Sequence, residues 1–233
     1  MNAKDKFIQN YSWKILSFLC VVIAYTVGLV MKVPNDAKLN ETIRNLYYHV
    51  PMWFGMTILL IVSLVYAIKY LSKPTAENDF YSSGFATTGV VYGILGIITG
   101  MFWGAYAWGT PWEMKDPKMI GVSIGMILYL AYFVLRGGIA DTQQRARISA
   151  VYNVFAFPSF IALIYIMPRL AGFSLHPGKE GNPGLNPKDA DAQMRIVFYI
   201  STVGVTLLGV WITLLQIRIK KILFNLENQQ HNI

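Results

Sequence analysis

The sequence has few charged residues and almost no cysteine. Only 14% of its 233 residues are charged and 55% are hydrophobic, whereas soluble proteins average about 25% charged residues. A water-soluble single domain is thereby excluded. The only cysteine, Cys20, lies in an apolar run, so the chain has no disulfide framework, no Cys-x-x-Cys pair and no Cys-x-x-Cys-His motif. Any metal or redox chemistry must come from other residues.

Acidic residues are also scarce. Asp and Glu number 12 against 20 Lys and Arg, which gives a net charge of +8. In so apolar a chain this excess predicts contact with membrane lipid rather than with nucleic acid, since basic residues gather at membrane surfaces. We therefore expect no nucleic-acid partner.

Charge-free stretches predict six membrane-spanning helices. A spanning helix needs roughly 17 to 25 mainly apolar residues, and six stretches satisfy this: Ile15–Met31, Val50–Ile68, Phe80–Trp112, Met119–Leu135, Ile148–Pro168 and Ile196–Ile217. The third, with 33 residues, is too long for one crossing, so we place its helix at 83–103 and expect a loop after it. The prediction is an all-α polytopic membrane protein of one domain, 1–233, with spans at about 15–32, 50–70, 83–103, 119–136, 148–168 and 196–218.

The distribution of Lys and Arg predicts the orientation of these spans. Six crossings put both termini on one side, which carries 11 Lys and Arg against nine on the other, so the termini are expected in the cytoplasm. The outside segments are then about 33–49, 104–118 and 169–195. Lys4 and Lys6 precede the first span, but no signal-peptide exit follows it, so we expect a retained anchor.

The chain has only three histidines, and two fall on the predicted outside face. His49 directly precedes the second span, His176 lies in a loop rich in Gly and Pro, and His231 lies in the polar tail. Two neutral imidazoles are a common way to hold haem iron from both sides. His49 and His176 are therefore candidate ligands, although a single interfacial histidine often has no such role.

An aromatic cluster lies on the same predicted face. Residues 103–112 contain Trp103, Tyr106, Trp108 and Trp112, interrupted by Gly and Pro. This pattern favours a flat apolar surface in a loop, suited to a porphyrin. Enrichment of Trp and Tyr at membrane interfaces explains it equally well. The nearby cations could contact either haem propionates or lipid headgroups; they are Arg44, Lys115, Lys118 and Arg169.

These segments resemble the cytochrome c maturation protein C family (CcmC, haem exporter protein C) over nearly the whole chain. Residues 44–51 resemble the family's Arg-x-x-Tyr-x-His-Val-Pro segment, and residues 174–178 resemble its Thr-Leu-His-x-Gly. The resemblance implies that His49 and His176 are axial ligands of a non-covalent haem b. It also implies that a tryptophan-rich loop holds the haem, with Trp108, Gly109 and Trp112 in it.

That loop departs from the family pattern, which is close to Trp-Gly-Thr-Trp-Trp-x-Trp-Asp. Pro111 and Met114 replace two of its tryptophans. The acidic position falls on Lys115 without a gap and on Asp116 with one inserted residue. Contacts to the propionates or within the loop are expected from Arg44, Asp116 and Arg169.

The resemblance implies a non-enzymatic role in haem trafficking. It predicts a multi-pass protein of the bacterial inner membrane that holds haem at the periplasmic face and delivers it to a periplasmic haem chaperone (CcmE-like) for c-type cytochrome maturation. The expected neighbours are ABC-transporter subunits (CcmA/CcmB-like), a small CcmD-like membrane protein and lipid.

Three other classes compete with this reading. A cytochrome c synthase of the same superfamily uses a second histidine pair, for which this chain has too few histidines. A b-type cytochrome subunit has its ligands inside the spans, where this sequence has no histidine. A permease usually carries ionisable residues near the membrane midplane, and these spans have none.

Overall fold

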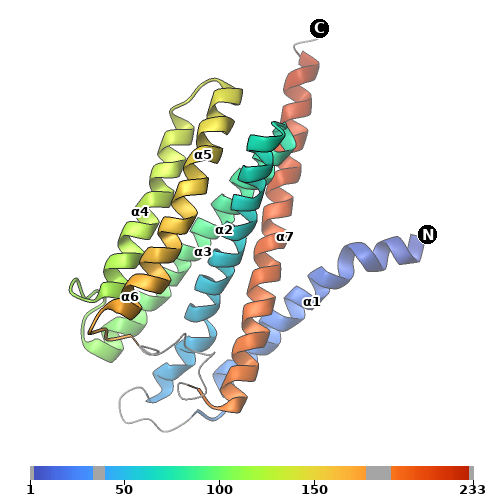
Figure 1. Ribbon diagram of the computed structural model, residues 1–233. Coiled ribbons are helices and arrows are strands. Elements are labelled where there is room, and N and C mark those ends of the chain that lie inside the picture. Colours follow the sequence, from blue (N-terminus) through green and yellow to red (C-terminus); the bar gives the residue numbers. More distant parts are fainter. Residues whose placement is uncertain (1–2, 34–39, 177–189, 231–233) are drawn as a thin grey trace.

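The computed structural model describes residues 3–33, 40–176 and 190–230, and over these it is helical throughout, without a strand (Figure 1). The elements in order are α1 (Ala3–Val30), the 3-10 helix η1 (Asn40–Tyr47), α2 (His49–Ser72), α3 (Ala76–Trp108), α4 (Pro117–Gly137), α5 (Thr142–Ile161), the π-helical turn η2 (Ala162–Ile166), α6 (Met167–Leu170) and α7 (Ala192–Gln230).

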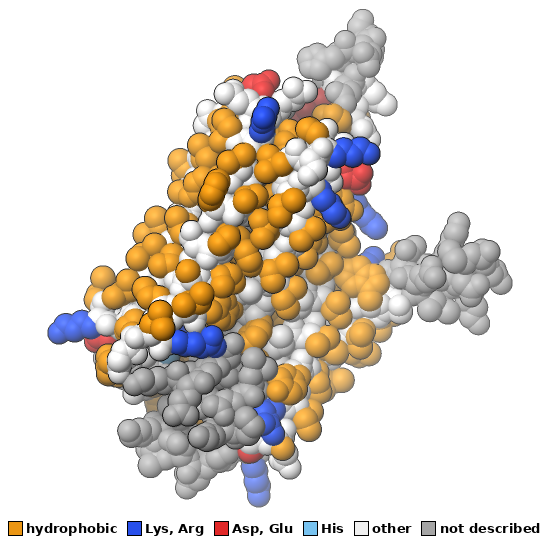
Figure 2. All heavy atoms as spheres, viewed as in Figure 1, with side chains coloured by type: hydrophobic (Ala, Val, Ile, Leu, Met, Phe, Trp, Pro, Cys, Tyr) orange, Lys and Arg blue, Asp and Glu red, His pale blue; other side chains and the backbone are white. Residues whose placement is uncertain are grey.

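Six helical stretches are long and apolar enough to cross a membrane, which confirms the predicted all-α polytopic fold. Hydrophobic side chains cover the middle of the face in Figure 2, and the charged ones lie toward its two ends. Large exposed side chains such as Phe102, Val134 and Phe155, each more than 70% exposed, would be unfavourable in water. They suit a surface that faces lipid.

α2 and α3 form the centre of the bundle (Figure 1). α7 packs on them with α1 along its outer side, and the α4–α5 hairpin packs on α2 mainly through α5. Buried polar contacts join the helices: Ser63 Oγ donates to Ser82 O (2.7 Å), and Asn153 Nδ2 donates to Ser63 Oγ (2.8 Å). Such bonds satisfy polar groups that apolar surroundings would leave unpaired.

The end of the third span differs from the prediction. α3 continues to Trp108 instead of ending near Trp103, so Tyr106 and Trp108 lie on the helix with Trp103 and not in the predicted loop. The helix ends only at Gly109, whose φ of 76° is the left-handed conformation that glycine adopts without strain. Aromatic residues alone do not terminate a helix, so the composition of this segment was a poor guide to its end.

The fifth crossing is interrupted. Pro158 lies inside α5, and the π-helical turn η2 follows before α6. Turns of this kind are frequent at functional sites because they redirect side chains. Here Tyr165 of η2 has its hydroxyl 2.7 Å from Thr57 Oγ1 of α2. The π-helical turn thus bonds the fifth crossing to α2, and the segment that carries His176 follows it in the chain.

Candidate functional site

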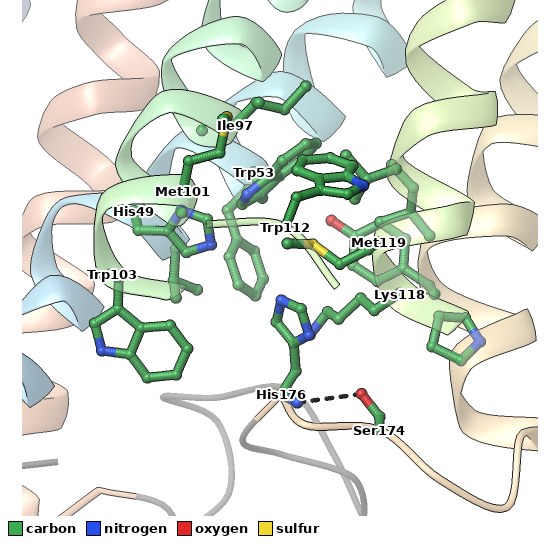
Figure 3. Close-up of a pocket in the computed structure, with 18 of the residues that line it drawn as sticks. His49, Trp53, Ile97, Met101, Trp103, Trp112, Lys118, Met119, Ser174 and His176 are labelled. Carbon is green, nitrogen blue, oxygen red and sulfur yellow. Dashed lines mark hydrogen bonds between the residues drawn. The ribbon is translucent and has the colours of Figure 1, made fainter. Parts of the chain in front are cut away.

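A cavity of about 100 Å³ lies at the end of the bundle where α2 begins and α3 ends, here called the histidine end. Its walls come from α2, α3, the segment between α3 and α4, α4, η2, α6 and the segment 171–176. Figure 3 shows His49 and His176 turned toward one another across it. Residues used below that line it are His49, Trp53, Gly96, Gly100, Trp103, Trp112, Lys118, Met119, Tyr165, Arg169, Ser174 and His176.

His49 is the first residue of α2, and its ring is oriented by α3. Its Nδ1 lies 3.1 Å from Thr99 Oγ1. The Thr99 hydroxyl has one hydrogen, and the carbonyl oxygens of Leu95 (2.8 Å) and Gly96 (3.1 Å) accept it. With its hydrogen given to a carbonyl, the Thr99 hydroxyl is placed to accept from His49 Nδ1–H. This leaves the lone pair on Nε2, the arrangement typical of a histidine that binds a metal.

Two glycines let α3 approach α2 at this point. A Cβ atom at Gly100 would lie 2.7 Å from His49 Cε1, and one at Gly96 would lie 2.8 Å from Trp53 Cε2. Both distances are far shorter than ordinary carbon contacts. The two glycines are four residues apart and so share one face of α3, as small residues do where membrane helices pack closely.

His176 is oriented by Asp116. Its Nδ1 lies 3.3 Å from Asp116 Oδ1, within ion-pair distance, and makes no hydrogen bond among the described residues. A carboxylate beside Nδ1 favours the tautomer with the hydrogen on Nδ1 and the lone pair on Nε2. The neighbours of both imidazoles thus favour the same tautomer.

Asp116 is fully buried and joins two parts of the site. As the N-cap of α4, its Oδ1 accepts from the N–H groups of Lys118 (2.9 Å) and Met119 (3.3 Å). Its Oδ2 accepts from Ser174 Oγ (2.9 Å) and Leu175 N–H (2.7 Å). One carboxylate thus fixes the start of α4 and holds the segment that carries His176.

Burial and these contacts shift the pKa values of Asp116 and His176. Burial alone raises the pKa of Asp116, but the contact with His176 and the hydrogen bonds from Leu175 and Ser174 bring it below its usual range. Burial lowers the pKa of His176, with Lys118 adding to this and Asp116 opposing it. The neutral imidazole is thereby favoured, and that is the form that coordinates metals.

The aromatic residues divide into those at the cavity and those away from it. The Trp108 ring packs edge to face on the His176 ring, with centroids 4.7 Å apart, and on Trp103 at 5.0 Å. Trp103 and Trp112 line the cavity itself. Tyr106 does not line it and is 66% exposed. Gly109, which the sequence also placed in the haem-holding loop, terminates α3.

The candidate cations divide in the same way. Lys118 and Arg169 line the cavity, whereas Lys115 is exposed and does not. Arg44 lies elsewhere: its Nη1 donates to the carbonyl oxygens of Gly28 (2.8 Å) and Met31 (2.6 Å). Arg44 therefore satisfies carbonyl groups at the C-terminal end of α1 and anchors η1 there.

Several lining residues were not predicted from the sequence. Trp53 follows His49 by four residues, so helical spacing placed it on the same face. The spacing of Gly96 and Gly100 was a signal of close helix packing. Thr99 orients His49 without lining the cavity. Its role could not be recognised in the sequence, because a threonine inside an apolar span most often bonds only to its own helix.

The donor set fits haem better than a bare metal ion. Among the described residues no group of three or more His, Cys, Asp or Glu could hold a metal ion, whereas haem iron needs only two axial ligands from protein. The cavity, at about 100 Å³, lies below the roughly 300 Å³ of typical enclosing ligand sites. A haem would therefore protrude from it or separate its walls.

Fold and site together define a polytopic membrane protein with a paired-histidine site at one end of a helical bundle. The family model described as "Heme exporter protein C" (CcmC) matches residues 5–232. The chain belongs to this family.

Curated relatives agree with this assignment. The chain is 26% identical over 206 residues to a heme exporter protein C of Paracoccus denitrificans, covering 85% of this chain and 80% of the relative. It is 29% identical over 169 residues to that of Rhodobacter capsulatus, covering 69% of each. For the protein of Escherichia coli strain K12, identity is 23% over 207 residues, with 84% and 79% covered. Membership implies a role in haem handling for cytochrome c maturation.

Proposed function

We propose that this protein binds haem b non-covalently at the histidine end, with His49 and His176 as axial ligands, and delivers it to a periplasmic haem chaperone. One observation carries the proposal. Two imidazoles from separate elements face one cavity, and each has its Nδ1 against an acceptor, which leaves Nε2 for iron.

The other lining residues suit the porphyrin. Trp103, Trp112 and Trp53 offer apolar ring surface beside the two imidazoles. Lys118 and Arg169 bring positive charge to the same cavity and would pair with the two propionates. When bound, the haem iron takes its two axial ligands from the protein and needs no other protein donor.

Delivery follows from the unequal anchoring of the two histidines. His49 is held within the bundle by α3, whereas His176 lies on an irregular segment tied mainly through Asp116. A carrier must release its cargo, and a ligand on a loop is easier to displace than one on a packed helix. A chaperone histidine or other donor would therefore replace His176 first.

The proposal includes the location and orientation of the protein in the cell. The protein lies in the bacterial inner membrane with both termini in the cytoplasm and the histidine end in the periplasm. The family name indicates association with other Ccm components, and we take these to be CcmE-like, CcmA/CcmB-like and CcmD-like proteins. The role is that of a carrier and not of a catalyst.

Transfer of haem tests the function directly. Protein purified in mild detergent and loaded with haem is mixed with a haem-free CcmE-like chaperone, and the two are separated by affinity tag. Haem is expected to be recovered with the chaperone. The haem that His176→Ala protein retains should transfer faster than that retained by His49→Ala protein, since only His176→Ala lacks the ligand that is displaced first. Retention of all haem on the membrane protein would contradict delivery.

Cysteine labelling tests the orientation. In a Cys20→Ser background, Gly172→Cys places a thiol at the histidine end and Gly138→Cys places a matched one at the opposite end, both at exposed glycines with room for a side chain. A membrane-impermeant thiol reagent applied to intact cells with a permeabilised outer membrane is expected to label Gly172→Cys alone. Labelling of Gly138→Cys alone would reverse the topology.

Replacement of Thr99 tests the orientation of His49. Thr99→Val keeps the shape but removes the acceptor of His49 Nδ1–H, and we expect haem affinity to fall about tenfold, as for other outer partners of metal ligands. Thr99→Ser keeps the hydroxyl and is the matched control. In a His49→Ala background the valine change is expected to have no further effect. An equal loss there would mean that Thr99 acts on the fold and not through His49.

A further inference from the structure

A second cavity lies at the opposite end of the bundle. Its volume is about 1420 Å³, and it is bounded by the end of α2, the start of α3, the α4–α5 hairpin and the C-terminal part of α7. Among the described residues α4 and α7 do not contact each other. They lie on different sides of α2 and α3 (Figure 1), and the cavity opens between them. None of its lining residues belongs to the histidine end.

The walls of this cavity carry four cations and three carboxylates. The cations are Arg136, Arg145, Arg147 and Lys220, and the carboxylates are Asp79, Asp141 and Glu227. The Arg136–Asp79 pair is self-contained, since both guanidinium nitrogens Nη1 and Nη2 bond the carboxylate, at 2.7 and 2.5 Å. Asp141 Oδ1 accepts from Gln144 N–H at 2.6 Å and caps α5. Over the whole lining, the four cations exceed the three carboxylates by one positive charge.

Lys220 is a half-buried cation that bonds a hydroxyl group instead of a carboxylate. Its ammonium donates to Ser83 Oγ at 2.9 Å, and no carboxylate of the described residues lies within ion-pair distance of it. A half-buried ammonium without a counter-ion is unfavourable. Its neighbour Lys221 differs, because it pairs with Glu77 and does not line the cavity. Lys220 is therefore placed to receive an anion from outside the protein.

Apolar side chains form another part of the lining and reach the lipid-facing surface. Phe80 and Phe224 pack edge to face with centroids 5.6 Å apart, and Phe133, Leu71 and Leu223 also line the cavity. Leu223 is 54% exposed and Phe224 40% exposed. A ligand that fits these walls needs both an anionic group and a hydrocarbon part.

The cations also lie at the level of a lipid phosphate. Arg136 directly follows the charge-free stretch of α4, Arg147 directly precedes that of α5, and Lys220 lies three residues beyond that of α7. These are the positions at which spanning helices leave the hydrocarbon core. Basic sites between helices at this depth are typical binding sites for anionic lipid headgroups.

We propose that this cavity binds one anionic phospholipid, with its phosphate on Lys220 and Arg147 and an acyl chain along Phe80 and Phe133. The single positive excess matches one phosphodiester. A free phosphate has no hydrocarbon part to cover the aromatic walls, which would stay in water. A zwitterionic lipid has no net charge and would not neutralise the excess positive charge of the lining. The proposed lipid site does not involve haem. A negative result for lipid binding would therefore not bear on the histidine site.

Lipid binding to paired lysine variants tests the proposal. The full chain in mild detergent is titrated with phosphatidylglycerol or phosphatidylcholine, and bound lipid is counted by native mass spectrometry. Phosphatidylglycerol is expected to bind in preference to phosphatidylcholine. Lys220→Gln should weaken that binding about fivefold, the usual effect of one basic contact, while Lys221→Gln should leave it unchanged.

Three results would overturn the proposal. They are equal binding of both lipids, equal loss from Lys220→Gln and Lys221→Gln, and displacement of the lipid by millimolar inorganic phosphate. Arg147→Gln is a second variant whose exposed side chain makes no ion pair among the described residues, so the fold does not depend on it. It too should weaken phosphatidylglycerol binding, and unchanged binding in that variant would equally refute the site.

Discussion

Replacing either His49 or His176 by alanine is expected to remove low-spin haem from the protein. Each variant loses one of two axial bonds, so the loss of affinity should exceed the roughly 10- to 100-fold that removal of an outer partner costs. Any haem that remains should be five-coordinate, and titration in detergent followed by visible absorption measures both properties. The double variant should bind no more than the weaker single one.

The third histidine offers the matched control. His231→Ala removes an imidazole as well, and we expect its haem content and spectrum to equal those of the unchanged protein. If His49→Ala and His176→Ala both kept low-spin haem while His231→Ala lost it, the ligand assignment would be wrong.

Removal of the Asp116 side chain is expected to damage both the fold and the site. Asp116→Ala removes the N-cap of α4, which costs about 1 kcal/mol, and leaves the donors of Ser174 and Leu175 without an acceptor, which costs a further 1–3 kcal/mol or so. The segment carrying His176 would lose its main attachment. We expect a lower melting temperature in detergent together with weak haem binding.

Asp116→Asn separates these two effects. The single amide oxygen can still cap α4, but the amide nitrogen in the place of Oδ2 donates and cannot accept from Leu175. Part of the stability should therefore remain, and the charge beside His176 is gone. The stable protein is then expected to bind haem with a higher midpoint potential, because a carboxylate partner makes imidazole a stronger donor to iron. An unchanged potential in Asp116→Asn would show that Asp116 acts on stability alone.

The histidine pair could be predicted from the sequence because histidine is so rare in it. Only three are present, and the charge-free stretches put His49 and His176 on one face. Their contact with one cavity needed the fold, since 126 residues separate them. The role of Thr99 could not be predicted, because it depends on how α3 packs against α2. Asp116 before Pro117 is a local N-cap pattern, but its bond to the segment that carries His176 depends on the fold.

The boundaries of the elements were less predictable than their number. Charge-free stretches mark where a helix is buried in lipid, not where its hydrogen bonds end, so α1 and α7 extend into their charged flanks. For α3, the aromatic residues near Trp103 suggested a loop, but the backbone continues until Gly109 adopts its left-handed conformation. Local composition gave no sign that Tyr106 would face outward while Trp103 faces the cavity.

The coordination of haem in the unchanged protein tests the central claim most directly. Protein purified in mild detergent and supplied with haem is measured by visible and low-temperature electron paramagnetic resonance spectroscopy, oxidised and after reduction with dithionite. Two imidazole ligands predict a low-spin ferric signal and sharp, well-separated visible bands on reduction. A high-spin signal in the oxidised protein, or no haem bound even after addition, would contradict a bis-histidine site formed by His49 and His176.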